Sequence, residues 1–248
     1  MSGHSKWATI KHKKAATDAK RGKLFGKLVR AVEVAAREGG GDVGGNPTLA
    51  TMVEKARKAA VPMENIERAI KRGTGELQGE SYTSFTYEGY APAGVAVLVD
   101  ILTTNKNRAA SDVRSAFSKN NGNLGEPGSV AWMFTQTGVI ILAEGADEDK
   151  ALDVALEAGA DDVITDDGQS IEIRTPASAL RAVSEALEAA GIPFESADVT
   201  MLPSTTVPLD KSDATKVLRL IDALEDLDDV QEVYANFDIS EEILVEVG

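Results

Sequence analysis

The chain has 248 residues, 43% of them hydrophobic and 27% charged, with a formal net charge of −14 and no cysteine. This length allows two or three modest cores, and we expect three small domains. The sequence has neither the roughly 20 apolar residues that cross a bilayer nor the apolar stretch of a secretory signal, and the lack of cysteine excludes disulfides, zinc ribbons and thiol catalysis. We therefore expect a cytoplasmic protein.

Charge is divided unevenly along the chain. Residues 1–80 contain 16 Lys and Arg against 9 Asp and Glu, a net charge of +7, whereas the remainder contains 10 against 31, a net charge of −21. Binding of a polyanion depends on the local potential and not on the total charge. The first third is therefore the expected interaction region.

The first predicted helix covers about residues 15–37, which lack proline and are rich in Ala, Lys, Leu and Arg. Glycines at 39–41 follow it and favour its end. At 100° per residue, an apolar face that contains Leu28 and Val32 adjoins a basic face. The basic face contains Lys20, Lys23, Lys27, Arg30 and Arg37. Packing of the apolar face inward should leave Lys20, Lys23, Lys27 and Arg30 along one exposed edge.

Two shorter helices are predicted at about residues 48–60 and 62–72, after a glycine-rich loop. Pro62 suits the first turn of the later helix and Gly73 suits its end. Residues 1–79 are therefore expected to form a basic, all-helical domain.

Beyond residue 80 the hydrophobic pattern changes to that of strands alternating with helices. Residues 136–203 follow the order βαββαβ, which is that of a ferredoxin-like domain. Because that unit is a complete sheet, a last helix at about 212–227 and a last strand at about 230–235 are expected to join the sheet that begins at Phe85. We predict an α+β fold with three domains, an N-terminal helical domain followed by two α/β domains. The ferredoxin-like domain (136–203) is inserted in a discontinuous middle domain (80–135 plus 204–248), where strands are expected at 85–88, 94–102 and 129–134 and a helix at 109–119.

The segment before the first helix combines cations with one aromatic ring and two histidines. Phosphates attract such a tract, and Trp7 can stack on a base. The alternative is a solvated basic tail, which would not need an aromatic residue. The expected nucleic-acid-binding residues are Lys6, Trp7, Lys11, His12, Lys13, Lys14, Lys20, Arg21, Lys23, Lys27 and Arg30.

Neither a catalytic nor a metal site is expected. His4 and His12 are the only histidines, too few for a zinc site, and a Ser-His-Asp arrangement would need one of them from the unpacked tail. Acidic pairs such as those at 147–149 can hold Mg²⁺, but they fall at predicted helix starts and turns, where carboxylates have structural roles. The glycine-rich stretches lack nucleotide-loop spacing. We expect no cofactor and no small-molecule substrate, and an enzyme with an acidic cleft between the α/β domains is the alternative class.

Several long motifs occur in order along the chain. They include residues 3–7 (GHSKW), 18–23 (DAKRGK), 65–70 (NIERAI), 87–90 (YEGY), 122–125 (GNLG), 128–132 (GSVAW), 155–160 (ALEAGA) and 228–234 (DDVQEVY). In these motifs the chain resembles the YebC family. One departure lies at residues 46–50 (NPTLA), where the family carries NPRLR, so the second helix lacks two cations and is not included among the expected binding residues.

The resemblance implies a helical first domain, two α/β domains and a non-enzymatic regulator of gene expression. Family members are described as probable transcriptional regulators that bind DNA. Relatives that include the mitochondrial translational activator of cytochrome c oxidase are described as acting at the ribosome on difficult peptides such as proline runs. The chain has no helix-turn-helix for reading bases, whereas binding to ribosomal RNA needs only shape, phosphate contacts and stacking. DNA and ribosomal RNA both remain expected partners.

Overall fold

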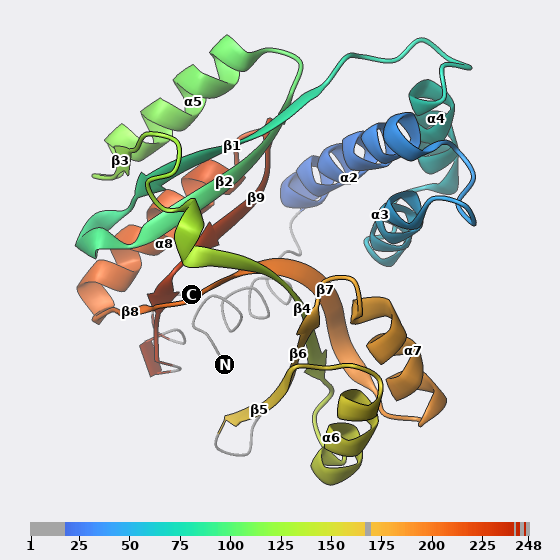
Figure 1. Ribbon diagram of the computed structural model, residues 1–248. Helices are drawn as coiled ribbons and strands as arrows, with labels where there is room; N and C mark the ends of the chain where they lie inside the picture. Colours follow the sequence, from blue (N-terminus) through green and yellow to red (C-terminus); the bar gives the residue numbers. More distant parts are fainter. Residues whose placement is uncertain (1–17, 167–169, 241, 244–245, 247–248) are drawn as a thin grey trace.

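The computed structural model describes residues 18–166, 170–240, 242–243 and 246 (Figure 1). A helical region comes first, and two regions that each contain one four-stranded sheet follow it. The predicted α+β class, with a helical domain ahead of α/β domains, is thereby confirmed. Within the described residues, no helix combines the length and apolar character needed to span a membrane.

The helical region has a small core of its own. Val32, Leu49 and Ile66 are fully buried where its three helices meet. The side chain of Asn46 accepts a hydrogen bond from Leu49 N at 3.0 Å and donates to the Ala35 carbonyl at 2.8 Å. This cap ties the start of one helix to the end of another. The helices are α2 (Asp18–Gly39), α3 (Pro47–Lys58) and α4 (Met63–Gly73).

The second region is an antiparallel sheet in the order β3-β1-β2-β9, and two helices cover one of its faces (Figure 1). Along β2, Val97, Val99 and Ile101 point into the core with these helices, while Ala96 and Leu98 lie in a smaller cluster on the other face. The alternation is that of a strand buried on both sides. The elements are β1 (Thr83–Tyr90), β2 (Ala96–Thr103), α5 (Lys106–Lys119), β3 (Asn123–Leu124), α8 (Lys211–Glu225) and β9 (Val230–Ala235).

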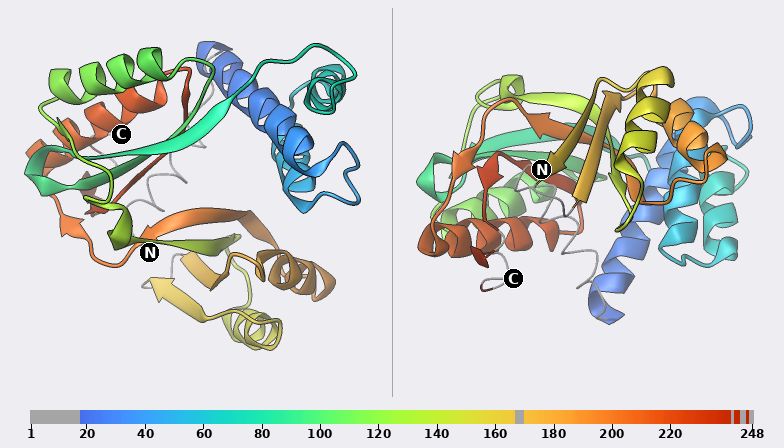
Figure 2. Two further views of the ribbon diagram at one scale, coloured as in Figure 1. Left: turned by 45° about the horizontal axis from the view of Figure 1, so that its top comes forward. Right: turned by 90° about the horizontal axis from the view of Figure 1, so that it is seen from below.

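The third region has the strand order β5-β6-β4-β7 with every neighbouring pair antiparallel, which is the ferredoxin-like arrangement (Figure 2). Ile140, Ile173 and Leu187 form its core. The region lies in sequence between β3 and β9, so the other sheet takes strands from both sides of it. We propose that the domain boundaries are those expected from the sequence, at residues 1–79, 80–135 plus 204–248, and 136–203. The elements are β4 (Phe134–Leu142), α6 (Glu148–Glu157), β5 (Asp162–Asp166), β6 (Ser170–Pro176), α7 (Leu180–Ala189) and β7 (Phe194–Pro203).

The strand expected at residues 129–134 was wrong. A short 3-10 helix, η2 (Ala131–Met133), stands there, and β4 begins only at Phe134. The buried carboxylate of Glu88 causes the difference, because it accepts hydrogen bonds at 2.6 to 2.7 Å from the N–H groups of Gly128, Val130 and Ala131. Burial disfavours the charged carboxylate, but the three donors outweigh it and hold the pKa of Glu88 below its usual range.

Three further short elements complete the fold. They are η1 (Pro92–Gly94), β8 (Val207–Pro208) and β10 (Phe237–Asp238), of which the last two form a parallel pair. Close to them, the side-chain oxygen of Asn236 accepts a hydrogen bond from Ala96 N at 2.7 Å. This bond joins the end of β9 to the start of β2.

Candidate nucleic-acid interface

The expected binding residues divide into two groups. Those of the N-terminal segment lie outside the described residues, and of Lys20 only the backbone is described. The side chains that can be placed are those of Arg21, Lys23, Lys27 and Arg30, all on α2.

Three of these cations contact the end of α8 and the turn that follows it. Lys23 Nζ donates to the Asp226 carbonyl at 3.0 Å and to its carboxylate at 3.2 Å, and Lys27 Nζ donates to the Glu225 carbonyl at 2.7 Å. Arg30 Nη2 donates to the carbonyl of Asp228. The last carbonyls of a helix have no partner within the helix and carry a partial negative charge. The α2 cations therefore serve as a cap for α8.

We refer to Lys23, Lys27 and Arg30 as the α2 row. Their spacing of four and three residues places them on one side of the helix. We expected this side to be an exposed edge, and that expectation was wrong, because Lys27 and Arg30 are half-buried against the second region. Lys23 remains 42% exposed. The row therefore already donates hydrogen bonds to main-chain oxygens at the end of α8 and in the turn after it.

Asp229 joins the row to α5. Its carboxylate is buried and accepts two hydrogen bonds from Arg108, from Nε at 3.0 Å and from Nη2 at 2.9 Å. Arg30 approaches the same carboxylate at 3.9 Å. Sequence reasoning did not identify the two arginine partners of this aspartate, which lie about 120 and 200 positions away in the chain.

Other cations of the helical region also form ion pairs. The buried carboxylate of Glu33 accepts from Arg37 at 3.1 Å and from Arg72 at 2.8 Å. Lys55 pairs with Asp198 of β7 at 2.8 Å. Arg21 is different, because it is exposed and its guanidinium lies 5.5 Å from the centroid of the Phe25 ring.

The acidic cluster at residues 147–149 has the structural role that its position predicted. Asp147 caps α6 by accepting from Lys150 N at 3.1 Å, and the two acids after it lie in the first turn. Among the described residues, no group of three or more His, Cys, Asp or Glu side chains is arranged to hold a metal ion.

Sequence reasoning missed a second group of cations, in the acidic part of the chain. Lys119, at the end of α5, lines a pocket together with Lys216 and Arg219 of α8. The signal was present in the sequence, because cations after residue 80 are concentrated in the two segments that form α5 and α8.

Comparison with known proteins agrees with the motifs. Residues 5–76 match the family described as the TACO1/YebC protein N-terminal domain, and residues 82–237 match the TACO1/YebC second and third domain. A relative from Rubrobacter xylanophilus is 58% identical over 250 residues and covers 100% of both chains, and one from Geobacter sulfurreducens is 57% identical over 242 residues and covers 98% of both. Both are named probable transcriptional regulatory protein.

A solved structure has a similar fold over most of the chain. The crystal structure of a conserved hypothetical protein from Aquifex aeolicus has a TM-score of 0.80 and 49% sequence identity, and the match covers 92% of this chain and 94% of that chain. Together the two matched families account for nearly the whole sequence. The chain therefore belongs to the TACO1/YebC family.

Proposed function

We propose that this protein is a non-enzymatic, cytoplasmic regulator of gene expression that binds nucleic acid, with DNA as the first expected target. The names of its relatives support regulation of transcription. The binding residues that we propose are the α2 row, Lys20, Arg21 and the basic segment that precedes α2. No cofactor and no small-molecule substrate enter this proposal.

The α2 row is the observation that carries the proposal. Its three cations donate to three main-chain oxygens at the end of α8 and in the turn after it, with N···O distances of 2.7 to 3.0 Å for the two lysines. A nucleic-acid backbone also offers oxygen acceptors in line, and each phosphate carries a full negative charge where a carbonyl carries a partial one. On binding, the α2 row would leave the carbonyls at the end of α8 and contact phosphates instead.

Such an exchange requires α2 to separate from α8, and the packing favours this. Each apolar cluster of described residues lies either within residues 25–70 or beyond residue 84, so no apolar core joins the helical region to the other two. Polar contacts join them at the α2 row and at Lys55. Interfaces of this kind permit domains to move.

Competition between phosphates and the end of α8 for the α2 row can be tested with two variants that have opposite expected effects. Lys23→Met with Lys27→Met removes cations from the row and should weaken binding to a labelled 30-base-pair duplex. Asp226→Lys leaves the row intact but repels it from α8, and should strengthen binding because a larger fraction of molecules has the row free. The controls are Lys58→Met, which removes one cation whose ion pair lies within α3, and Glu188→Lys, which makes the same change of charge as Asp226→Lys at an exposed site on α7.

The affinities should be measured across a salt series, because each lost phosphate contact lowers the salt slope by about 0.9. Equal affinity of wild type and the double lysine variant would refute the α2 row as a binding site. The same titration with ribosomal RNA fragments distinguishes the targets. Tighter binding to ribosomal RNA than to the duplex would assign the protein to the ribosome and not to transcription.

A further inference from the structure

Positive charge in the acidic part of the chain is concentrated on two neighbouring helices. Residues 81–248 contain 10 cations and 31 acids, and α5 and α8 carry seven of those cations but only four of the acids. The two helices pack against each other on the same face of the sheet (Figure 1). The seven cations are Lys106, Arg108, Arg114 and Lys119 on α5, and Lys211, Lys216 and Arg219 on α8.

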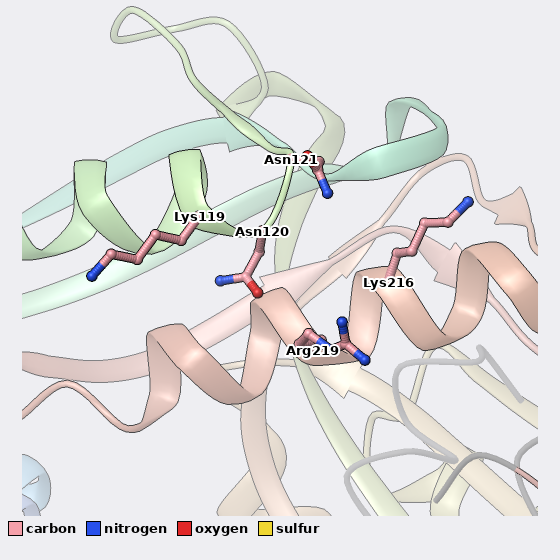
Figure 3. A pocket seen from close by; sticks show the side chains of 5 residues that line it. All are labelled: Lys119, Asn120, Asn121, Lys216 and Arg219. Carbon is pink, nitrogen blue, oxygen red and sulfur yellow. The ribbon is translucent and has the colours of Figure 1, made fainter.

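A pocket opens between the end of α5 and the middle of α8 (Figure 3). Its lining consists wholly of cations and amides, which are Lys119, Asn120, Asn121, Lys216 and Arg219. No carboxylate lines it. We call these five residues the α5/α8 site.

The turn that carries the two asparagines is fixed in place. Gly122 N donates to the Phe117 carbonyl at 2.9 Å, and Asn120 Nδ2 donates to the Ala116 carbonyl at 2.8 Å. A Cβ at Gly122 would approach Leu220 of α8 to 2.9 Å, so the turn lies tightly against α8. Asn121 has a positive φ of 58°, in the region where asparagine is the usual alternative to glycine. The amides are therefore presented by a rigid element.

The donors of this site are available. Lys119, Asn121 and Arg219 are exposed, and their side chains form no hydrogen bond or ion pair within the described part of the chain. Lys216 is exposed and pairs with Asp213 at 2.7 Å. In contrast, Arg108 and Arg174, also beyond residue 80, are engaged by buried carboxylates.

We propose that the α5/α8 site is a second contact for the phosphate backbone of nucleic acid. Figure 3 shows Lys119 and Lys216 extending to opposite sides, with Asn120 and Arg219 between them. Cations spread along a line suit an extended polyanion, whereas a single phosphate ion would need them to converge. The proposal rests on the proposed function, because it assumes that the protein binds nucleic acid.

The site also has a defined place relative to the α2 row. The row meets the C-terminal end of α8, while Lys216 and Arg219 lie in its middle and Lys119 lies at the far end of α5 from Arg108. Figure 1 shows the C-terminal end of α5 on the side of the second region away from α2, α3 and α4. The two contacts would therefore add to each other and not replace each other.

The test compares two full-length variants with the same change in net charge. Lys119→Glu with Arg219→Glu alters the α5/α8 site, and Lys150→Glu with Arg181→Glu alters exposed cations of the third region. Binding is measured by fluorescence anisotropy with a 30-base-pair duplex and a 30-nucleotide single-stranded RNA across a salt series. For the site variant we expect affinity to fall about tenfold or more and the salt slope to fall by about 1.8 on duplex and about 1.4 on single strands. The control should keep the wild-type slope.

The outcomes separate the two proposals. Wild-type affinity and slope for the site variant, with wild type still binding, would overturn this inference and leave the proposed function standing. Failure of wild type to bind either probe would end both proposals. Should circular dichroism show that the glutamate variant is unfolded, Lys119→Gln with Arg219→Gln replaces it, with the same loss of slope expected.

Discussion

The contact between the α2 row and α8 should set how firmly the helical region is held to the rest of the protein. Replacing Lys23, Lys27 and Arg30 by methionine keeps the aliphatic part of each side chain and removes the charge. A hydrogen bond from a charged group contributes about 1.5 to 3 kcal/mol when buried, but partly exposed ones contribute less. Lys23 is 42% and Arg30 21% exposed, so we assign about 1 kcal/mol to each of the more buried contacts and about 0.5 kcal/mol to Lys23.

The total of about 2.5 kcal/mol corresponds to about a 70-fold shift from docked to undocked molecules. Because the chain has no cysteine, spin labels can be attached at cysteines introduced at two exposed positions, Thr51 on α3 and Ser111 on α5. Pulsed electron paramagnetic resonance should give one narrow distance distribution for the otherwise unaltered protein and a broad one for the triple methionine variant.

Two controls make this measurement decisive. Lys58→Met removes an ion pair within α3, at 2.9 Å from Glu54, and should leave the distribution narrow. Duplex DNA added to the protein with an intact row should broaden or displace the distribution if phosphates compete with α8. A triple methionine variant that stays as narrow as the unaltered protein would show that these contacts do not hold the regions together.

Two further variants test the packing and the electrostatics of the fold. Gly73→Ala should destabilise the helical region by about 1 to 3 kcal/mol, because its Cβ would meet the Glu33 carbonyl and lie 2.7 Å from Ala36 Cβ. Gly26→Ala should stabilise the region slightly, because a Cβ there meets nothing within 4 Å. Thermal unfolding that ranks the two variants in the opposite order would refute this. Glu88→Gln should cost about 1 to 3 kcal/mol at neutral pH. The folded-state pKa of Glu88 is lowered, so its contribution is present above the unfolded pKa of about 4.3 and is lost as pH falls through the lower folded value. Denaturant titrations should show the gap to wild type closing below about pH 4, and a gap independent of pH would contradict the charged role of this carboxylate.

The elements that sequence predicted well are those with a strong local signal. The helix at 212–227 and the strand at 230–235 were found to within two residues, and the βαββαβ order was sufficient to predict the ferredoxin-like sheet. The segment at 129–134 has strand-like residues, but its N–H groups bind Glu88, which lies about 40 positions earlier. No local pattern contains that information, because a tertiary contact overrides the propensity.

The sign of the charge along a sequence does not say which charges are free to bind. In the basic first third, the α2 row caps α8 and Glu33 engages Arg37 and Arg72, so much of the positive charge already has acceptors. In the acidic remainder, Lys119 and Arg219 are exposed, and no carboxylate lines the pocket between them. Local potential depends on partners that only the folded chain brings together, often about 200 positions apart. The region with the larger net positive charge can therefore be the one whose cations must first be released, while a smaller group in an acidic domain is ready to bind.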